Sequence, residues 1–365
     1  MSIFRVHRLA AAALLSLALS SSARARDVYI AIAGPMTGST AALGAQIRDG
    51  AAAAVDPINA SGLLPDTRLI LRIADDACDP KQAVAVANRL TSDGIKLVVG
   101  HFCSSSSIPA SDIYAEAGVV QISPGSTNPR LTERGLTTVF RICGRDDQQG
   151  RVAAEYIARH HRGAKLAVLD DKSTAGKGIA DIVESQLRAA GEHTFRQSYV
   201  AGEKDYTALV SRLKREGIQL VYVGGYYNEI GLIVRQAAEA GARLTMMAND
   251  PLMTSDFLAI AGDAANVTLF TFMPDPTTNA AGAAAVAKLQ AAGYTLYAYA
   301  AVQAWADSVK RAGSFDATRV AAALRSDSIE TAIGTLRFDS KGDNAAPGFI
   351  VYRWRDNTVE AVEQN

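Results

Sequence analysis

The stretch V-V-G-H-F-C-S-S-S-S at residues 98–107 decides the fold class of this chain. Its β-branched residues end at Gly100, and a row of four serines begins at Ser104. This pattern is typical of a buried parallel strand that leads into a helix. The first amides of such a helix lack partners within it and lie at the positive end of its dipole, so they suit a carboxylate. Ser104 is therefore a candidate ligand contact. The alternative is that the serines only cap the helix.

Strand-like runs alternate with helical ones from residue 28 to residue 123, and a second, similar series begins after Arg141. Strands separated by helices predict a parallel sheet covered on both faces. The chain is therefore predicted to be α/β, with two doubly wound parallel-sheet lobes facing a cleft. Ligands of such sheets bind outside the carboxyl ends of the strands. The expected strands are 28–33, 68–73, 97–100, 119–123, 165–169, 194–200, 220–223, 244–247 and 267–271. Helices then dominate 280–324, and strands return in 329–355 around a turn at 339–343.

Composition and charge narrow the class of protein. The 37 basic and 37 acidic residues of the 365-residue chain cancel, which argues against a nucleic-acid binder. Arg5 and Arg8, the apolar residues 9–19 and the small-x-small sequence ending at Ala25 predict a signal peptide over residues 1–25. No later stretch approaches 18 unbroken apolar residues, so we expect no membrane insertion. The mature protein is expected to be exported and soluble.

Three cysteines, Cys78, Cys103 and Cys143, remain after this segment. Two of them should pair in an oxidising compartment. Cys78 and Cys103 each follow a strand-like run of the same N-terminal unit, which favours a bond between these two. Cys143 lies in an apolar run and is expected to be a buried free thiol. The spacing does not indicate a metal site, and no cofactor is expected.

Small and polar residues follow several predicted strands. Gly125 lets the backbone approach a ligand closely, and Thr127 offers a hydroxyl and an amide. Tyr226 and Asp250 follow strands of the second series, and Asp146, just before its first helix, joins the candidate set. Each residue alone is typical of a turn or a helix cap. Together they offer hydroxyls and amides to an anion and a carboxylate to an ammonium group, which is what a zwitterionic amino acid needs.

Motifs of enzymes are missing from the sequence. It contains no G-x-S-x-G nucleophile elbow, no G-x-x-x-x-G-K-[ST] phosphate loop and no G-x-G-x-x-G fingerprint. Asp75 and Asp76 are adjacent carboxylates, but no second such pair faces them. We therefore expect a protein that is not an enzyme.

Longer segments carry a family resemblance: D-D-A-C-D-P-K-Q-A-V-A-V-A-N at 75–88, G-H-F-C-S-S-S at 100–106, and residues 109–114, 201–205 and 224–226. The chain resembles the periplasmic leucine/isoleucine/valine-binding proteins of branched-chain amino-acid ABC transporters over essentially its whole mature length, more weakly between about residues 273 and 292. The resemblance implies a type I periplasmic binding fold with three hinge strands. It also implies the Cys78–Cys103 disulfide. The lobes are expected at 26–145 plus 275–345 and at 146–274 plus 346–365.

The resemblance also implies a ligand set. Ser104 and the backbone of Thr127 would hold the carboxylate of the ligand. The carbonyl of Gly125, the hydroxyl of Thr127 and the carboxylate of Asp250 would hold its ammonium group. Tyr226 would close over the ligand from the second lobe.

Departures from the family pattern bear on specificity. Phe102 stands where leucine binders have Leu, Asp250 replaces a Glu, and Tyr294 replaces a Phe. Phe102 takes volume from a branched side chain, and Asp250 is one methylene shorter. These changes predict alanine, valine, proline or a γ-amino acid such as 4-aminobutyrate in preference to leucine. Leu43 and Ala175, each in place of a Tyr, act in the opposite direction by removing bulk.

We expect the protein to capture a branched-chain or small aliphatic amino acid and to deliver it to an inner-membrane ABC permease. We also expect it to be a monomer. One alternative is a ligand-sensing module that presents the amino acid to a membrane receptor. Another is an amino-acid-processing enzyme, which would turn its ligand over.

Overall fold

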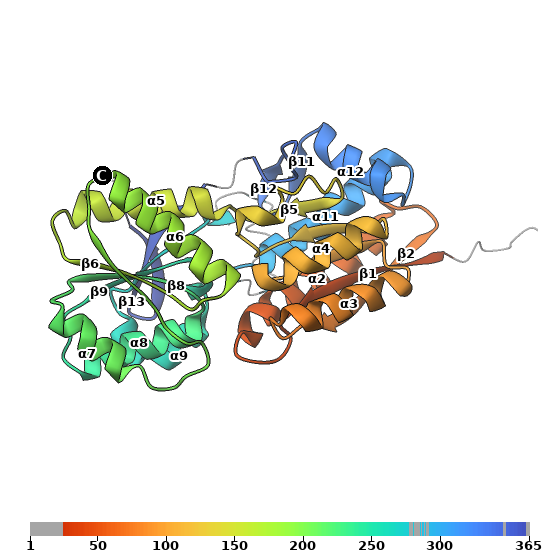
Figure 1. The fold of residues 1–365 in the computed structure, drawn as a ribbon. Coiled ribbons are helices and arrows are strands. Elements are labelled where there is room, and N and C mark those ends of the chain that lie inside the picture. The colour runs from red at the N-terminus through yellow and green to blue at the C-terminus, as the bar shows by residue number, and fades with distance from the viewer. Residues whose placement is uncertain are drawn as a thin grey trace, which may run out of the picture.

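The computed structural model describes residues 25–276, 292–345 and 348–362, together with residues 280, 285, 287 and 289. Residues 1–24 of the expected signal peptide lie outside these ranges, as does most of 277–291 in the expected helical region. No helix within the described ranges is long and apolar enough to cross a membrane. The chain forms two lobes, each built around one sheet (Figure 1).

The sheet of the first lobe has five parallel strands in the order β2-β1-β3-β4-β5. These strands are β1 (Arg26–Gly34), β2 (Thr67–Asp75), β3 (Leu97–Gly100), β4 (Val120–Ser123) and β5 (Val139–Arg141). Helices α3 (Pro80–Ser92) and α4 (Ser104–Glu116) pack together, and α2 (Ala41–Ser61) packs against α11 (Thr295–Ala312), which also contacts α12 (Ala317–Ser326). The short elements of this lobe are η1 (Pro129–Leu131) and the pair β11 (Ile329–Thr331) and β12 (Gly334–Leu336).

The sheet of the second lobe has the order β14-β13-β10-β9-β8-β6-β7. Its parallel strands are β6 (Leu166–Asp170), β7 (Thr194–Ser198), β8 (Leu220–Gly224), β9 (Thr245–Ala248) and β10 (Leu269–Phe272). Helices α5 (Asp146–His160) and α6 (Thr174–Ala189) lie on one side of the sheet, and α7 (Thr207–Arg215), α8 (Tyr227–Glu239) and α9 (Ser255–Ala261) on the other (Figure 1). The 3₁₀ turns η2 (Asp250–Leu252) and η3 (Gly262–Ala265) complete the lobe.

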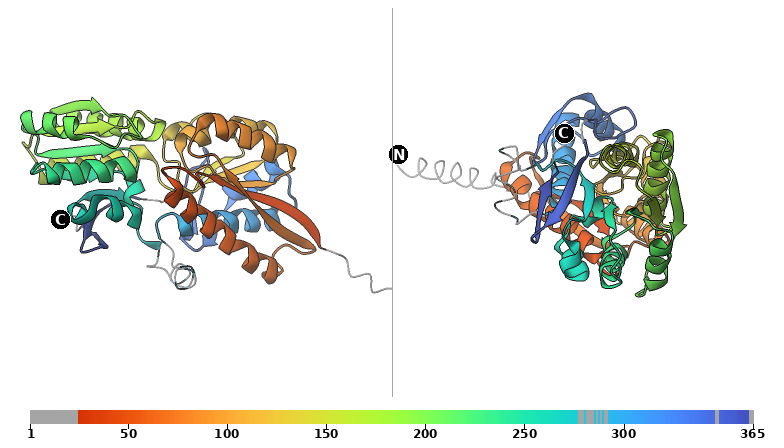
Figure 2. Two further views of the ribbon diagram at one scale, coloured as in Figure 1. Left: turned by 90° about the horizontal axis from the view of Figure 1, so that it is seen from below. Right: turned by 90° about the vertical axis from the view of Figure 1, so that its left-hand side faces the viewer.

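Both sheets have the same strand order within their parallel parts. In each, the second strand in sequence lies at the edge, followed by the first, third, fourth and fifth. The order reverses between β1 and β3 and between β6 and β8, which is where such sheets bind ligands. The chain passes between the lobes three times: after β5, after β10 and before β13. The prediction of two doubly wound lobes is confirmed (Figure 2).

The second sheet departs from the expected parallel arrangement at one edge. Strands β13 (Ile350–Arg355) and β14 (Thr358–Ala361) are antiparallel to their neighbours. They are joined by Asp356 and Asn357, whose φ angles are 48° and 64°. Two residues of positive φ make the tight turn that matches the twist of a hairpin. This hairpin makes β14 antiparallel to β13, whereas β13 itself enters the sheet from the first lobe and not through a crossover helix of the second.

Helix α4 begins four residues earlier than the expected helix at 108–116. Cys103 occupies its N-cap position with extended backbone, and no side chain caps the helix. The alternative that the serines serve as caps is therefore wrong. Ser104, Ser106 and Ser107 are buried inside the first turns of the helix instead.

The disulfide between Cys78 and Cys103 is confirmed, with a Cα–Cα distance of 5.6 Å. Cys143 is free and buried, as expected. The bond joins the loop after β2 to the N-cap of α4, so it fixes the start of the helix that carries Ser104.

Replacing both Cys78 and Cys103 with Ala should lower the free energy of unfolding by about 3 kcal/mol, because the bond closes a loop of 25 residues. Calorimetric melting of the variant and of the oxidised protein measures the effect. Dithiothreitol should lower the melting temperature of the parent but not that of the variant. A Cys143→Ser control should stay as sensitive to the reductant as the parent, and a parent insensitive to it would contradict the prediction.

Candidate functional site

The N-terminus of α4 faces the loop that follows β4. Ser104 is buried, and its Oγ accepts a hydrogen bond of 3.3 Å from the backbone N–H of Asn128. The backbone amides of Ser104 and Ser105 find no acceptor among the described residues. Free amides at the positive end of a helix dipole can receive an anion such as a carboxylate. The structure therefore brings Ser104 and the loop containing Thr127 together.

Aromatic rings form one wall beside this loop. The ring of Phe102 lies against Gly125, where a Cβ atom would come within 2.5 Å of the ring. Phe102 meets Tyr294 edge to face with ring centroids 4.8 Å apart, and Tyr294 packs in the same way on Phe272 at 5.2 Å. Any side chain at position 125 would displace Phe102. The glycine therefore lets the aromatic wall approach the loop of residues 125–128, the candidate ligand loop.

Asp250 is buried at the end of β9 and accepts hydrogen bonds on both carboxylate oxygens. Oδ1 accepts from Nε2 of Gln149 at 2.9 Å, and Oδ2 accepts from the hydroxyl of Tyr294. Burial raises the pKa of Asp250, although the two hydrogen bonds oppose that rise. Tyr294, predicted as a ligand contact, thus also orients the acid that would hold an ammonium group.

Asp146 is the first residue of α5, and its backbone N–H donates to the carbonyl of Thr127 at 2.9 Å. Its carboxylate is buried, and neither oxygen has a hydrogen-bond partner among the described residues. Burial and the nearby charge of Asp250 raise the pKa of Asp146 to about 7. The Thr127 hydroxyl and Arg141 lie close enough to oppose this rise, the hydroxyl without good hydrogen-bond geometry. Two buried carboxylates therefore share this part of the site, and only Asp250 has its hydrogen bonds satisfied.

Two residues that the sequence did not single out belong to the same cluster. Gln149 is fully buried and donates to Oγ1 of Thr271 at 2.9 Å as well as to Asp250, but its Oε1 atom has no partner among the described residues. The hydroxyl of Tyr222 is also unpartnered within that set, and both acids raise the pKa of Tyr222 after burial. Asp146 and Gln149 are three residues apart on α5, a spacing that places both on one helical face. This spacing from Asp146 was the feature of the sequence that could have identified Gln149.

Tyr226 lies at the N-cap of α8, directly after β8, and only 8% of it is exposed. Burial raises its pKa well above the usual value, and acids of both lobes add to the effect, including Asp171 of the second and Asp76 of the first. Leu43 is buried in α2, and Ala175 is half-buried at the start of α6.

The two lobes contact each other around the site. Hydrogen bonds that bridge them include Tyr227 Oη to Ser39 O at 2.9 Å, Gln46 Nε2 to Met253 O at 3.0 Å and Asn128 Nδ2 to Thr174 O at 2.9 Å. Asn228 also donates to the carbonyl of Ser39. This arrangement encloses the polar cluster between the lobes.

The adjacent acids Asp75 and Asp76 serve separate structural roles. Asp75 accepts hydrogen bonds from the backbone N–H and the hydroxyl of Thr37. Asp76 is fully buried and pairs with Nδ1 of His101 at 2.5 Å, while Nε2 of His101 lies 2.9 Å from the Tyr114 hydroxyl. Because they serve different partners, the two carboxylates do not form a catalytic pair.

A sequence model described as periplasmic binding protein matches residues 27–358. The chain is 45% identical over 335 residues to "Leu/Ile/Val-binding protein homolog 1" of Brucella suis, covering 90% of each chain. It is 44% identical over 363 residues to an "Amino acid binding protein" of Pseudomonas aeruginosa, covering 97% of each.

Solved structures show the same architecture. The leucine-binding protein LivK of Thermotoga maritima matches with a TM-score of 0.86 and 26% identity, over 92% of this chain and 98% of that one. The branched-chain amino-acid transporter protein LivJ of Streptococcus pneumoniae, in complex with isoleucine, matches with a TM-score of 0.83 and 25% identity, over 92% of this chain and 99% of that one.

Proposed function

Because this chain belongs to the periplasmic binding protein family, among relatives of the Leu/Ile/Val-binding proteins, we propose that it captures an amino acid between its lobes and delivers it to an ABC permease. Members of this family are solute-binding proteins and not enzymes. We place the mature protein in the periplasm, after removal of residues 1–25, and expect a monomer of two lobes at 26–145 plus 275–345 and 146–274 plus 346–365.

The two ends of a zwitterion find different partners in the enclosed site. We assign the carboxylate of the ligand to Ser104, the amide of Thr127 and the free amides at the start of α4. We assign its ammonium group to the Gly125 carbonyl, the Thr127 hydroxyl and the two buried acids. Asp146 is included because both of its carboxylate oxygens lack a donor among the described residues. Tyr226 covers the ligand from the second lobe.

The proposed class of ligand rests on the packing of Phe102 on Gly125. The ring is fixed from its other side by Tyr294, which is itself held by Asp250, so it has no free space to move into. A side chain as large as that of leucine next to the ligand loop would compete with this ring for volume. We therefore infer a preference for alanine, valine, proline or 4-aminobutyrate over leucine.

Mass spectrometry of the ligand that copurifies, followed by calorimetric titration with leucine, valine, alanine, proline and 4-aminobutyrate, tests this proposal. The small and γ-amino ligands should bind more tightly than leucine. Leucine binding a hundredfold more tightly than all of them would refute the ligand class while keeping the function. Absence of binding by any amino acid would refute the function itself.

Replacing Phe102 with Leu should change the ranking of the ligands. The smaller side chain returns volume beside Gly125, so leucine affinity should rise by about tenfold, equivalent to about 1.4 kcal/mol. Titration of the variant with leucine and alanine measures the ratio. Phe257→Leu removes an equally buried ring in the second lobe and is the matched control, for which the ratio should not change. An unchanged ratio in Phe102→Leu would place the determinant elsewhere.

Affinity for 4-aminobutyrate should rise by about tenfold between pH 6 and pH 8. Asp146, with a pKa near 7 in the ligand-free protein, is largely protonated at the lower pH, and an ammonium group binds the ionised form. Binding should therefore release a proton, and neither charged group of the ligand titrates in this range. Titration in buffers of different ionisation enthalpy counts that proton. Asp146→Asn should flatten the profile, and a flat profile in the parent would contradict the prediction.

A further inference from the structure

Arg141 is a fully buried arginine beneath the ligand loop. Its Nη1 atom donates to the carbonyls of Ser126 at 3.0 Å and Asn128 at 2.7 Å, the two residues that flank Thr127. Its Nε and Nη2 atoms donate to Oδ1 of Asp343 at 2.9 and 2.7 Å. One planar guanidinium therefore joins the backbone on both sides of Thr127 to a carboxylate 202 residues later in the chain.

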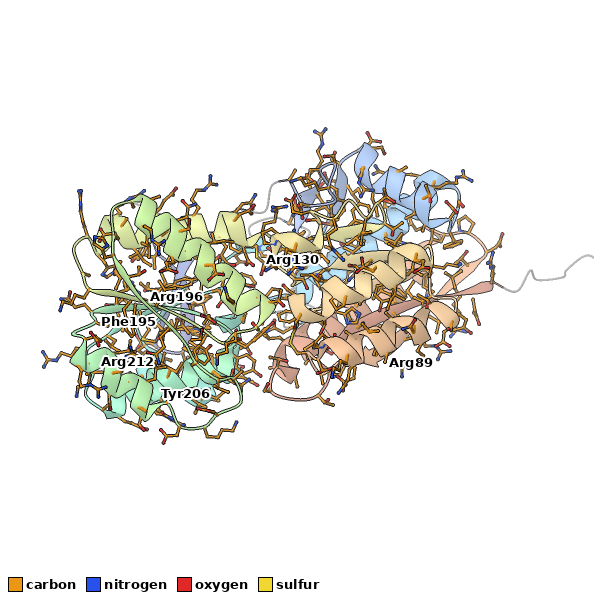
Figure 3. All side chains as sticks on the ribbon, viewed as in Figure 1. Arg89, Arg130, Phe195, Arg196, Tyr206 and Arg212 are labelled. Carbon is orange, nitrogen blue, oxygen red and sulfur yellow. A yellow bond between two sulfur atoms is a disulfide. The ribbon has the colours of Figure 1, made fainter. Side chains whose placement is uncertain are left out.

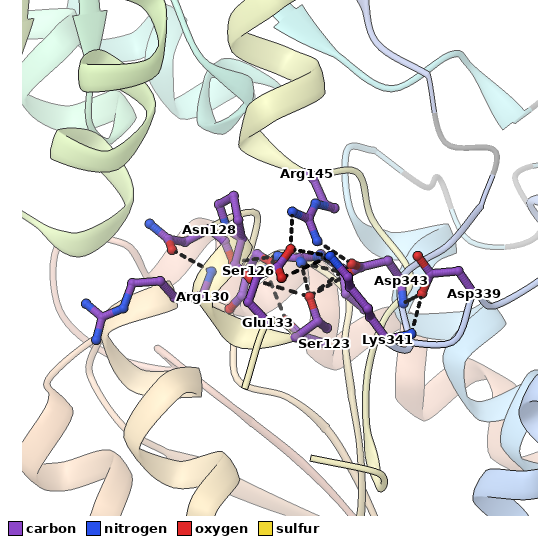
Figure 4. A network of polar contacts seen from close by, with 12 residues as sticks. Ser123, Ser126, Asn128, Arg130, Glu133, Arg145, Asp339, Lys341 and Asp343 are labelled. Carbon is purple, nitrogen blue, oxygen red and sulfur yellow. Dashed lines mark hydrogen bonds and ion pairs between the residues drawn. The ribbon is translucent and has the colours of Figure 1, made fainter. Parts of the chain in front are cut away.

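Asp343 also binds the far end of the first passage between the lobes. Its Oδ2 atom accepts from Nη1 of Arg145 at 2.6 Å. Arg141 ends β5 and Arg145 precedes α5, so Asp343 pairs with arginines at both ends of the connecting residues 142–144. Figure 4 shows the surrounding network, in which Lys341 also pairs with Glu133 at 2.7 Å. The passage between the lobes is thus held by a carboxylate from the segment that leads to the third passage.

The ligand loop has two further ties to the second lobe. The carbonyl of Thr127 accepts from the backbone N–H of Asp146, and the side chain of Asn128 donates to the carbonyl of Thr174 on α6. Arg141, which lies at the hinge, therefore fixes the position of the ligand loop. The loop also contacts the second lobe directly. A change in the hinge can therefore reach Thr127 through the side chains of Asp343 and Arg141 as well as through the backbone N–H of Asp146.

We propose that Arg141 is a positioning residue, which sets the orientation of the Thr127 amide, hydroxyl and carbonyl and couples them to the hinge through Asp343. It does not touch the ligand. The inference rests on the proposed function in so far as residues 125–128 bind ligand. The arrangement itself, a loop held by a hinge arginine, is a property of the ligand-free protein.

Arg141→Lys is the sharpest test. A lysine keeps the positive charge beside Asp343, but a single ammonium cannot also reach both carbonyls. Backbone amides of residues 126–128 should exchange hydrogen faster in the ligand-free variant, and affinity for the tightest amino acid should fall by about ten- to a hundredfold. Arg196→Lys is the matched control. Arg196 pairs with the buried Asp170 at 2.7 Å, in the second lobe (Figure 3), and its replacement should leave both readouts unchanged.

Thr132→Val provides a milder variant in case Arg141→Lys does not fold. The Thr132 hydroxyl donates to Asp343 and accepts from Nη2 of Arg141 at 2.6 Å, so its loss should loosen the same loop with a smaller fall in affinity. Unchanged exchange at residues 126–128 in both variants would overturn the inference, as would an equal loss of affinity in Arg196→Lys. A parent that binds no amino acid would overturn the proposed function alone, because the exchange measurement needs no ligand.

Discussion

Asp250→Asn is expected to weaken amino-acid binding by about a hundredfold or more, since loss of a buried, hydrogen-bonded charge partner costs about 2–5 kcal/mol. Asparagine keeps the shape of the side chain but cannot balance an ammonium group. Stability should respond in the opposite direction. Burial raises the pKa of this carboxyl in the folded protein, so ionised Asp250 opposes folding at neutral pH. The ligand-free variant should therefore melt at the same temperature as the parent or a higher one.

Calorimetric titration and ligand-free melting measure these two effects separately. Asp147→Asn is the matched control. Asp147 lies next to Asp146 in the first turn of α5, but its side chain is exposed and paired with Arg145. The control should retain the affinity of the parent. Asp250→Asn with unchanged affinity would remove Asp250 from the ammonium site and leave Asp146 as its only carboxylate.

His101→Phe is expected to lower the free energy of unfolding by about 3 kcal/mol, the cost of leaving a buried hydrogen-bonding group unsatisfied. Phenylalanine preserves the packing of the ring but leaves Oδ2 of Asp76 without its partner in the core. Urea titration at neutral pH measures the change.

A second substitution separates loss of the pair from loss of packing. Asp76→Asn in the His101→Phe background removes the unpaired carboxyl group, so the double variant should recover part of the lost stability. Tyr114→Phe removes only a hydroxyl from the same cluster and should cost about 1 kcal/mol. A His101→Phe protein that loses no more than Tyr114→Phe would show that the pair contributes little.

The alternation of strands and helices was sufficient to predict both doubly wound lobes, because parallel strands covered on two faces are continuous apolar runs. The residues of β3 and β6 are buried throughout and were readily recognised. Strand β5 was not predicted, because it is three residues long and ends in a buried arginine. The reason for that arginine is its pairing with Asp343, which no local pattern contains.

The candidate site could be predicted in part, for the same reason. Ser104, Gly125, Tyr226 and Asp250 all follow strands, and strand ends of a doubly wound sheet converge. Contacts between distant segments were beyond local patterns: Tyr294 meets Asp250 across 44 residues, and His101 meets Asp76 across 25. The unsatisfied carboxylate of Asp146 is likewise visible only once the surrounding residues are in place.

The packing of α2 on α11 has a consequence for the order in which the molecule assembles. Residues 41–61 of the first lobe are completed by residues 295–312, which follow the whole parallel sheet of the second lobe. Whether the chain emerges from a ribosome or from a membrane pore, its amino end comes first. The first lobe must therefore wait with an uncovered apolar helix face until nearly the entire chain has emerged, whereas β6 to β10 can pair as soon as they appear. Contacts so distant in sequence are slow to form, so the first lobe, although it begins the chain, completes its core only after β6 to β10 can have paired.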